Sequence, residues 1–424
     1  MATTARSRSG ASRSKATTRR GAPPLEHRML MTASLCLLAF GAVMVYSASS
    51  PPGALTGGGN GTGTLIRYLA FGALGLVAMY VLERRGLELI DERVTRLILL
   101  GAFALLLLVL VPGFGRVVLG ARRWFAAGPI QFQPSEVMKL ALVLHLSRYL
   151  AAHPKRLRSF REAVGPVAIV AGPAILLIVV EPDLGTALVV AFTVVTMMIA
   201  AGMPMRWIGI LAGIAAVAVL LMTVIQPYQR ARLTSFLNPW ASKSTDGFQA
   251  VQGQIALGSG GFFGVGLGKS VQKIFYLPEA QNDFILAVIG EELGVVGVFG
   301  VIVLYGMIAY AGLRTARRVS GRYAKLLATG LTSLILCQGT LNIFVVLGLA
   351  PLTGVPLPFI SYAPSNLCVM LASVGLLLNL SRPGARQLRS VAPPERDLAA
   401  DRDRRRRDRG ARRAGPGGGR RAAG

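Results

Sequence analysis

Charged residues are scarce in this chain, and acidic residues are scarcer than basic ones. Only 15% of the 424 residues are charged and 53% are apolar, with 19 Asp and Glu against 46 Lys and Arg. Because soluble domains carry about 25% charged residues, the composition excludes an ordinary soluble protein. Segments 98–111 (ILLGAFALLLLVLV) and 164–180 contain no charge at all, which indicates a polytopic membrane protein.

Cysteine and histidine are also rare, with three of each, and their placement excludes several kinds of chemistry. The cysteines lie in separate apolar segments, without the spacing of a disulfide or a zinc site. They are Cys36, Cys337 and Cys368. No Ser-His-Asp pattern is visible. The first apolar segment is too long for a cleaved signal peptide and has no small-residue cleavage site.

Glycine is abundant, with 50 residues, and the stretch 258–270 reads GSGGFFGVGLGKS. A phosphate-binding P-loop needs a glycine five residues before its last glycine, but that position here is Phe263. The following VQKIFYLPEAQND is polar and interrupted by Pro278, so the helix that a P-loop opens is missing. The pattern excludes an ATP loop, while the glycines and Lys269 leave open the recognition of a phosphate group in another setting.

The apolar blocks predict an all-α membrane protein, since about 20 mainly apolar residues cross a bilayer. Ten spans are predicted, at 30–49, 65–82, 94–113, 135–152, 164–181, 184–203, 207–226, 283–312, 326–349 and 357–381. A long connection, 227–282, separates the seventh span from the eighth. The predicted membrane domain covers 29–381, between a basic tail at 1–28 and an arginine-rich tail at 382–424.

Lys and Arg in the connections predict the orientation, because they concentrate on the cytoplasmic side. The tails carry net charges of +6 and +9, and connections 83–93, 153–161 and 314–325 are basic, whereas 50–64 and 350–356 contain no Lys or Arg. Ten spans with both termini cytoplasmic place every one of these basic segments inside. The tails have little to bury and are predicted to be disordered, in contact with anionic lipid rather than nucleic acid.

Two predicted outer connections, 114–134 and 227–282, break this charge rule. They contain Arg116, Arg122, Arg123, Arg230, Arg232, Lys243, Lys269 and Lys273. Basic residues kept on the outer face favour an anionic, phosphate-bearing ligand there. The alternative is contact with lipid headgroups.

Acidic residues in or near the membrane are functional candidates, because an unpaired charge there is costly. The candidates are Glu136, Glu181, Asp183, Asp283, Glu291 and Glu292. Glu136 lies one turn from Lys139, so a structural ion pair is equally open, and Asp183 is placed to cap the next helix. Asp283 follows the basic glycine-rich stretch, where it could accept a proton, hold a divalent cation or cap a helix.

Several stretches resemble one known family. They are VMVYSASS (43–50), GARRWFAAGPIQFQPSEVMKLAL (120–142), EPDLGTALVV (181–190), YQRARLTSFLNPW (228–240), GFQAVQGQIALGSGGFFGVGLGKSVQKIFYLPEAQNDFILAVIGEELG (247–294) and LTGVPLPFISY (352–362). Their content and order are similar to the SEDS family (shape, elongation, division and sporulation). GARRW and the segment from SFLNPW to GLGKS favour its division branch over its elongation branch.

The resemblance implies ten helices with both termini inside and a peptidoglycan glycosyltransferase in the plasma membrane at the division septum. The substrate would be lipid II, an undecaprenyl-diphosphate disaccharide-pentapeptide, polymerised on the outer face. Asp283 corresponds to the family's essential aspartate and would be the general base, with a divalent cation (Mn²⁺ or Mg²⁺) assisting and bound by Asp283. The implied substrate-binding residues are Arg122, Arg123, Lys269, Lys273, Glu136 and Ser361. A class B penicillin-binding protein and other divisome proteins would be partners.

The sequence departs from the family in two places. Residues 361–366 read SYAPSN where the family usually has SYGGSS, and Gln281-Asn282 replaces His-Thr before Asp283. Two other functions stay open: a lipid II flippase, which would rely on acids within the bundle such as Glu136 or Glu291, and a non-catalytic divisome scaffold.

Overall fold

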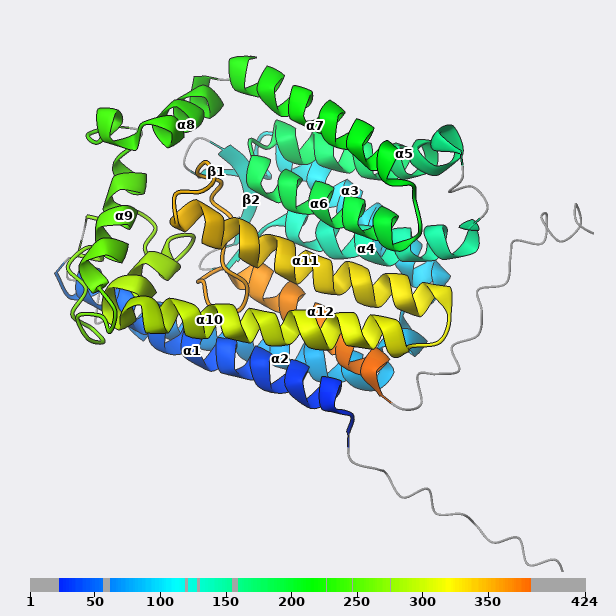
Figure 1. Cartoon of the computed structure of the whole chain (residues 1–424), viewed down its shortest axis with the longest axis horizontal. Helices are drawn as coiled ribbons and strands as arrows, with labels where there is room; N and C mark the ends of the chain where they lie inside the picture. Colours follow the sequence, from blue (N-terminus) through cyan, green and yellow to red (C-terminus); the bar gives the residue numbers. More distant parts are fainter. Residues whose placement is uncertain are drawn as a thin grey trace, which may run out of the picture.

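A computed structural model describes residues 23–55, 62–118, 121–127, 130–154, 159–225, 227–245, 247–274 and 276–382. Most of the two predicted disordered tails, 1–22 and 383–424, lies outside these residues. The described chain is predominantly helical, and its long helices run side by side in one bundle (Figure 1). The predicted all-α membrane fold is confirmed.

Ten long helices coincide with the ten predicted spans. They are α1 (Leu25–Leu55), α2 (Thr62–Leu89), α3 (Glu92–Leu110), α4 (Pro134–Ala152), α5 (Phe160–Val180), α6 (Leu184–Ala200), α7 (Met205–Ile225), α10 (Ile285–Arg318), α11 (Arg322–Val346) and α12 (Pro364–Ser381). Seven of the helices within the described ranges are long and apolar enough to cross a membrane, while α5 and α7 contain shorter apolar stretches. The number of spans and their orientation stay predictions.

The helices pack so that the most polar of them lie inside. Helix α12 lies along α2, α1 lies along α10, and α11 contacts α4, α6 and α10. Helix α4 is buried on most of its surface, including Glu136 and Lys139. Because protein rather than lipid surrounds α4, it needs less hydropathy than an exposed span.

Two predicted spans differ in detail from the structure. The span predicted at 357–381 becomes helical only at Pro364, and Leu357, Phe359 and Ile360 form an irregular buried segment before it. Irregular backbone at membrane depth is tolerated where protein buries it. Helix α10 is interrupted at Gly294, where φ is 65° and ψ is −159°. A Cβ atom there would lie 2.5 Å from the carbonyl oxygen of Phe262. Glycine therefore allows the backbone of the loop after α9 (Phe248–Gly260) to approach the helix closely.

One end of the bundle carries the connecting elements, and we call it the loop end. It contains β1 (Arg116–Val118), β2 (Ala121–Ala127), β3 (Ile130–Phe132), α8 (Pro227–Leu237), the 3₁₀ helix η2 (Pro239–Ser242) and α9 (Phe248–Gly260), together with residues 261–284 and 347–363. The strands pair antiparallel in the order β1-β2-β3. The predicted long connection between the seventh and eighth spans thus contains the two helices α8 and α9 and the 3₁₀ helix η2.

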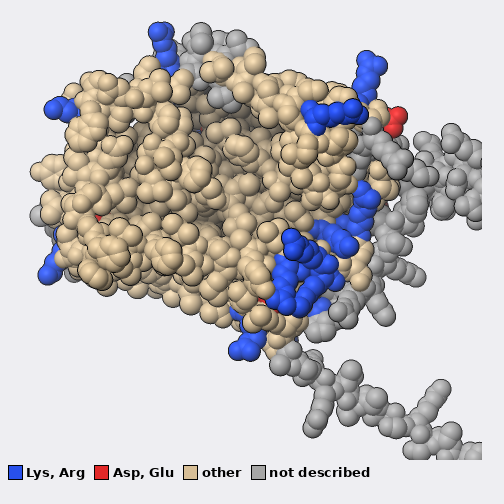
Figure 2. Space-filling view, viewed as in Figure 1, with Lys and Arg blue, Asp and Glu red and all other residues tan. Residues whose placement is uncertain are grey.

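The opposite end, from which both tails leave, is called the tail end (Figure 1). On the face shown in Figure 2, Lys and Arg side chains lie at the two ends and gather most densely at the tail end. The surface between the ends is almost free of charge. An uncharged band between two charged ends is the surface expected of a protein that crosses a bilayer.

Candidate active site at the loop end

Asp283 lies two residues before α10 and is partly accessible. Its backbone carbonyl accepts a hydrogen bond from Asn342 Nδ2 at 2.7 Å, and the same amide group donates to the carbonyl of Val355 at 2.8 Å. The carboxyl oxygen Oδ1 is buried without a hydrogen-bond partner among the described residues. The N-cap of α10 is Phe284, without a side-chain cap, so the alternative of Asp283 as a helix cap is wrong.

The surroundings of Asp283 disfavour its ionised form. Burial, followed by the nearby charge of Glu279, raises the pKa of Asp283 to about 7, against opposing effects that include Arg232 and Arg123. A carboxyl group with a pKa near neutral pH is suited to accept a proton and release it again. Gly354 lies beside it, since a Cβ atom there would be in van der Waals contact with Asp283 Oδ2 at 3.8 Å, and its φ of 71° favours glycine.

Two arginines contribute positive charge to the site from different elements. Arg232 of α8 donates from Nη1 to the carbonyl of Leu352 at 2.8 Å. Arg123 of β2 has a buried Nε without a hydrogen-bond partner in the described part of the chain. Arg122 lies next to it in the strand and donates from Nη1 to the carbonyl of Leu110, at a long 3.4 Å. The site therefore has positive charge beside its acid.

The turn between α5 and α6 brings two further acids to the loop end. Asp183 caps α6 by accepting from the amide of Thr186 at 3.1 Å, as predicted, and also accepts from Gln133 Nε2 at 2.7 Å. Glu181 is fully buried, and neither of its carboxyl oxygens has a hydrogen-bond partner among the described residues. Burial, and then the charge of Asp183, raise the pKa of Glu181 to about 9.

Glu136 lies at the centre of a buried polar network in the bundle. Lys139 Nζ lies 2.8 Å from Glu136 Oε2, which confirms the predicted ion pair. Asn366 Nδ2 donates to the same oxygen at 2.7 Å, and Lys139 also donates to Gln338 Oε1 at 2.6 Å. Ser365 Oγ accepts from the amide of Gln133 at 3.1 Å. The unusual SYAPSN stretch thus contributes Asn366 to this network and Ser365 to a contact with the residue before α4.

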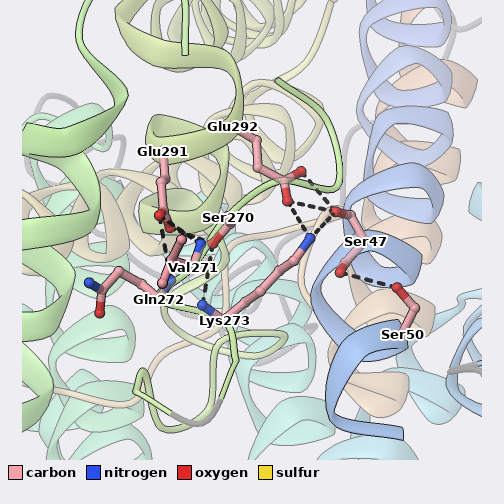
Figure 3. A network of polar contacts seen from close by, with 8 residues as sticks. All are labelled: Ser47, Ser50, Ser270, Val271, Gln272, Lys273, Glu291 and Glu292. Carbon is pink, nitrogen blue, oxygen red and sulfur yellow. Dashed lines mark hydrogen bonds and ion pairs between the residues drawn. The ribbon is translucent and has the colours of Figure 1, made fainter. Parts of the chain in front are cut away.

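The predicted basic ligand residues Lys269 and Lys273 have different environments. Lys269 is exposed. Lys273 is 2% exposed, lies 2.6 Å from Glu292 Oε1 and donates to Ser47 Oγ at 3.0 Å. Figure 3 shows this side chain reaching from the loop to α10 and α1. The loop is therefore joined to α10 by a buried ion pair and to α1 by a hydrogen bond.

Glu291, next to Glu292 in α10, binds the same loop through other groups. It accepts from the hydroxyl of Ser270, from the amide of Val271 at 2.9 Å and from the amide of Gln272 at a long 3.4 Å (Figure 3). Both adjacent acids are thus occupied in holding residues 270–273 against α10.

Ser361 is buried and accepts a hydrogen bond from the amide of Leu357 at 2.8 Å. The next residue, Tyr362, donates its amide to the carbonyl of Gln281 at 2.9 Å. This contact brings the departure that begins at Ala363 next to the departure at Gln281-Asn282, which directly precedes Asp283. The predicted site residues thus fall into a group around Asp283 and Arg123, a network around Glu136, and an ion pair at Lys273.

The family model described as cell cycle protein, FtsW/RodA/SpoVE, matches residues 27–385. The chain belongs to this family. Stage V sporulation protein E of Bacillus subtilis (strain 168) is 39% identical, covering 86% of this chain and 99% of that protein. The probable peptidoglycan glycosyltransferase FtsW of Thioalkalivibrio sulfidiphilus (strain HL-EbGR7) is 40% identical, covering 82% and 87%. The recognised SEDS resemblance is confirmed.

Solved structures agree with this FtsW/RodA/SpoVE membership. A peptidoglycan synthase complex that coordinates polymerisation and crosslinking contains a chain that is 30% identical, with a TM-score of 0.67 over 83% of this chain and 96% of the other. The rod shape determining protein RodA of Thermus thermophilus is 30% identical, with a TM-score of 0.60 over 83% and 95%. The sporulation protein and the FtsW proteins match about equally well, so identity does not separate the branches of the family.

The carboxylates of this FtsW/RodA/SpoVE chain limit how a divalent cation could bind. Within the described residues, no group of three or more His, Cys, Asp or Glu side chains could hold a metal ion. Asp283 and Glu279 are the acids that interact near the site. One or two carboxylates fit Mg²⁺ where substrate phosphates supply further ligands. A cation here fits a site completed by the substrate rather than a cage of protein ligands.

Sequence reasoning did not select several residues that position the site. Asn342 and Gln338 of α11 hold the segment at 355–356, and Gln133 joins Asp183 to the start of α4. Polar amides inside an otherwise apolar span, such as 326–349, are a signal that could have identified the first two. Gln133 had no such signal, since it lies in a polar connection.

Proposed function

We propose that this chain is the peptidoglycan glycosyltransferase that polymerises lipid II into glycan strands on the outer face of the plasma membrane during septal synthesis. The enzyme class is the one that its FtsW relatives carry in their names. The observation that supports it most is Asp283, a partly accessible residue whose buried carboxyl oxygen Oδ1 has no partner within the described structure. Opposing charges from Arg123 and Arg232 act on the same group.

In this proposal, Asp283 accepts the proton of the acceptor sugar hydroxyl. The hydroxyl oxygen attacks the anomeric carbon of the donor, and the new C–O bond replaces the bond from that carbon to the diphosphate. The electron pair of the broken bond stays on the departing undecaprenyl diphosphate. Arg123 and Arg232 balance the negative charge that develops there, which lowers the barrier.

A bound Mn²⁺ or Mg²⁺ would supply a further positive charge to the diphosphate. Asp283 would hold the ion and Glu279 would lie nearby. In addition, Arg122, Lys269, Lys273, Glu136 and Ser361 remain proposed substrate-binding residues. Glu136, Lys273 and Ser361 are buried and already bonded to other residues. Each would therefore affect substrate binding indirectly, by positioning the residues that it contacts.

A class B penicillin-binding protein is the proposed partner, with further divisome proteins, and no nucleic acid is involved. The solved complex similar to this chain coordinates polymerisation with crosslinking, which supports a partner that crosslinks the strands. The proposed location is the plasma membrane at the division septum.

The experiment is lipid II polymerisation by the purified full chain with its penicillin-binding partner, with Mn²⁺ or Mg²⁺. Wild type should form glycan chains, and Asp283→Asn should lose at least about 100-fold in rate, the range for a general base. Asn282→Ala is the matched control and should keep most of the activity. Equal rates for wild type and Asp283→Asn would remove Asp283 from the mechanism. No polymer from a folded wild type would favour the flippase or the scaffold.

A further inference from the structure

Glu181 is the one acid at the loop end whose two carboxyl oxygens both lack a hydrogen-bond partner within the described structure. Its relative exposure is 0%. A buried carboxylate without partners is strongly disfavoured, so such a group is neutral or has a charged neighbour that can move to it. The mechanism proposed for Asp283 does not use Glu181.

The charged groups that face Glu181 are few. Asp183, from the same turn, has both oxygens occupied, one by the amide of Thr186 and the other by Gln133. Arg123 of β2 has a buried Nε without a partner among the described residues. These are the two charges that act on Glu181, and none from the described parts of the other helices packed on α5 does so.

Arg123 acts on both acids of the site, since its charge opposes the protonation of Glu181 and of Asp283. A guanidinium group binds a carboxylate or a phosphate through the same planar set of donors. Ionised Glu181 and a diphosphate would therefore compete for Arg123. Protonated Glu181 would not compete, because a neutral carboxyl is a weaker acceptor.

We infer that Glu181 is a proton-controlled positioning residue for Arg123. In its protonated form it leaves the guanidinium free for the diphosphate of the lipid substrate, and in its ionised form it withdraws the guanidinium into an ion pair. This inference rests on the proposed function, because it gives Arg123 the diphosphate as its ligand.

The direction of the pH effect follows from the surroundings of Glu181. Its pKa is raised to about 9 by burial and by Asp183, with Arg123 opposing. Below that pH the carboxyl is protonated and Arg123 is available. As the pH rises through about 9, Glu181 ionises and diphosphate binding weakens.

The test measures binding of undecaprenyl diphosphate to the full chain in detergent at about pH 7.5 and about pH 10, for wild type and Glu181→Gln. We expect binding by wild type to weaken about tenfold at the higher pH, the value of one charge-assisted hydrogen bond. Glu181→Gln, which stays neutral, should bind at both pH values as wild type does at the lower one. Glu162→Gln, an exposed change in α5, the helix that precedes Glu181, should behave like wild type.

A second variant keeps the inference testable if Glu181→Gln does not fold. Asp183→Asn can still cap α6 but removes the negative neighbour that raises the pKa of Glu181. Its binding should therefore begin to weaken at a lower pH than that of wild type. An equal loss of binding in Glu181→Gln and wild type, or an unshifted profile for Asp183→Asn, would overturn the inference.

Polymerisation assays on the same samples separate this inference from the proposed function. Binding that follows the predicted profile without polymer from wild type would retain the role of Glu181 and remove the polymerase. If wild type forms polymer but its diphosphate binding does not depend on Glu181, the polymerase function would be retained and the role of Glu181 would be removed.

Discussion

Two buried acids at the tail end, Glu26 and Glu83, differ from two acids at the loop end, Glu181 and Asp283, in their partners. At the tail end, Glu26 of α1 lies 2.5 Å from Arg314 and 2.7 Å from Arg318, both of α10. Glu83 of α2 lies 2.5 Å from Arg382, just after α12. At this end each acid joins two elements by an ion pair.

At the loop end, Glu181 and Asp283 have buried oxygens without hydrogen-bond partners in the described structure. Glu26 and Glu181 are equally inaccessible, with relative exposures of 2% and 0%, so burial alone does not distinguish the ends. What differs is that Glu26 and Glu83 form ion pairs with arginines, whereas Arg123, whose charge acts on both Glu181 and Asp283, keeps a buried Nε without a hydrogen-bond partner among the described residues. Paired acids stabilise the bundle, whereas unpaired acids with raised pKa values cost stability and mark a site where a ligand or a proton completes the environment.

The largest expected effect concerns the unpaired Asp283 and the pH dependence of the reaction. With a pKa raised to about 7, Asp283 is ionised above that pH and protonated below it. Polymerisation should fall about tenfold for each pH unit below 7, because only the ionised form accepts a proton. Initial rates on lipid II from acidic to neutral pH would measure this. A profile that is flat through neutral pH would contradict the assignment.

The next largest effect is expected on stability, when the buried ion pair between Lys273 and Glu292 is broken. Lys273→Met leaves Glu292 buried without its partner, which costs about 3–5 kcal/mol and should lower Tm in detergent clearly. Lys269→Met, in the same loop but exposed, should change the stability by less than about 0.5 kcal/mol. Similar Tm values for the two variants would show that Lys273 does not hold the loop.

These two lysines show which structural features the sequence could predict and which it could not. The number of long helices, the turn capped by Asp183 and the pairing of Glu136 with Lys139 followed from apolar blocks and helical spacing. The difference between Lys269 and Lys273 did not, because Lys273 meets Glu292 and Ser47 only after α1 has packed on α10. Contacts between segments far apart in the chain cannot be predicted from the local sequence pattern of either segment.

The departures from the family pattern also became interpretable only in three dimensions. Ala363 is the N-cap of α12 and Pro364 is its first residue, where an amide hydrogen has no partner in the helix and proline is well tolerated. The contact between Tyr362 and Gln281 joins the second departure to the first. The sequence showed two separate substitutions, and the fold makes them one local variation beside Asp283.

Removing the amide of Asn366 should have a moderate effect within the network of Glu136. Asn366→Ala removes the 2.7 Å hydrogen bond to Glu136 and should destabilise the protein by about 1.5–3 kcal/mol, as for bonds to charged groups. Lys139 still neutralises Glu136, so the effect should be smaller than that of Lys273→Met. Thermal unfolding of both variants in one detergent would rank them. Asn366→Asp places two acids together and should be the more harmful change.

The smallest effect is expected at the tail end, where the ion pair between Glu83 and Arg382 is partly exposed to solvent. The side chain of Arg382 is 40% exposed, against 10% for Glu83, so water and salt weaken their attraction. A double-mutant cycle with Glu83→Gln and Arg382→Gln should give about 0.5–1 kcal/mol, less at high salt. Neither change should alter lipid II polymerisation, since the pair lies at the end of the bundle opposite Asp283. A coupling as large as that between Lys273 and Glu292 would mean that exposure does not set the strength of these ion pairs. A loss of polymerisation would mean that the two ends act on each other.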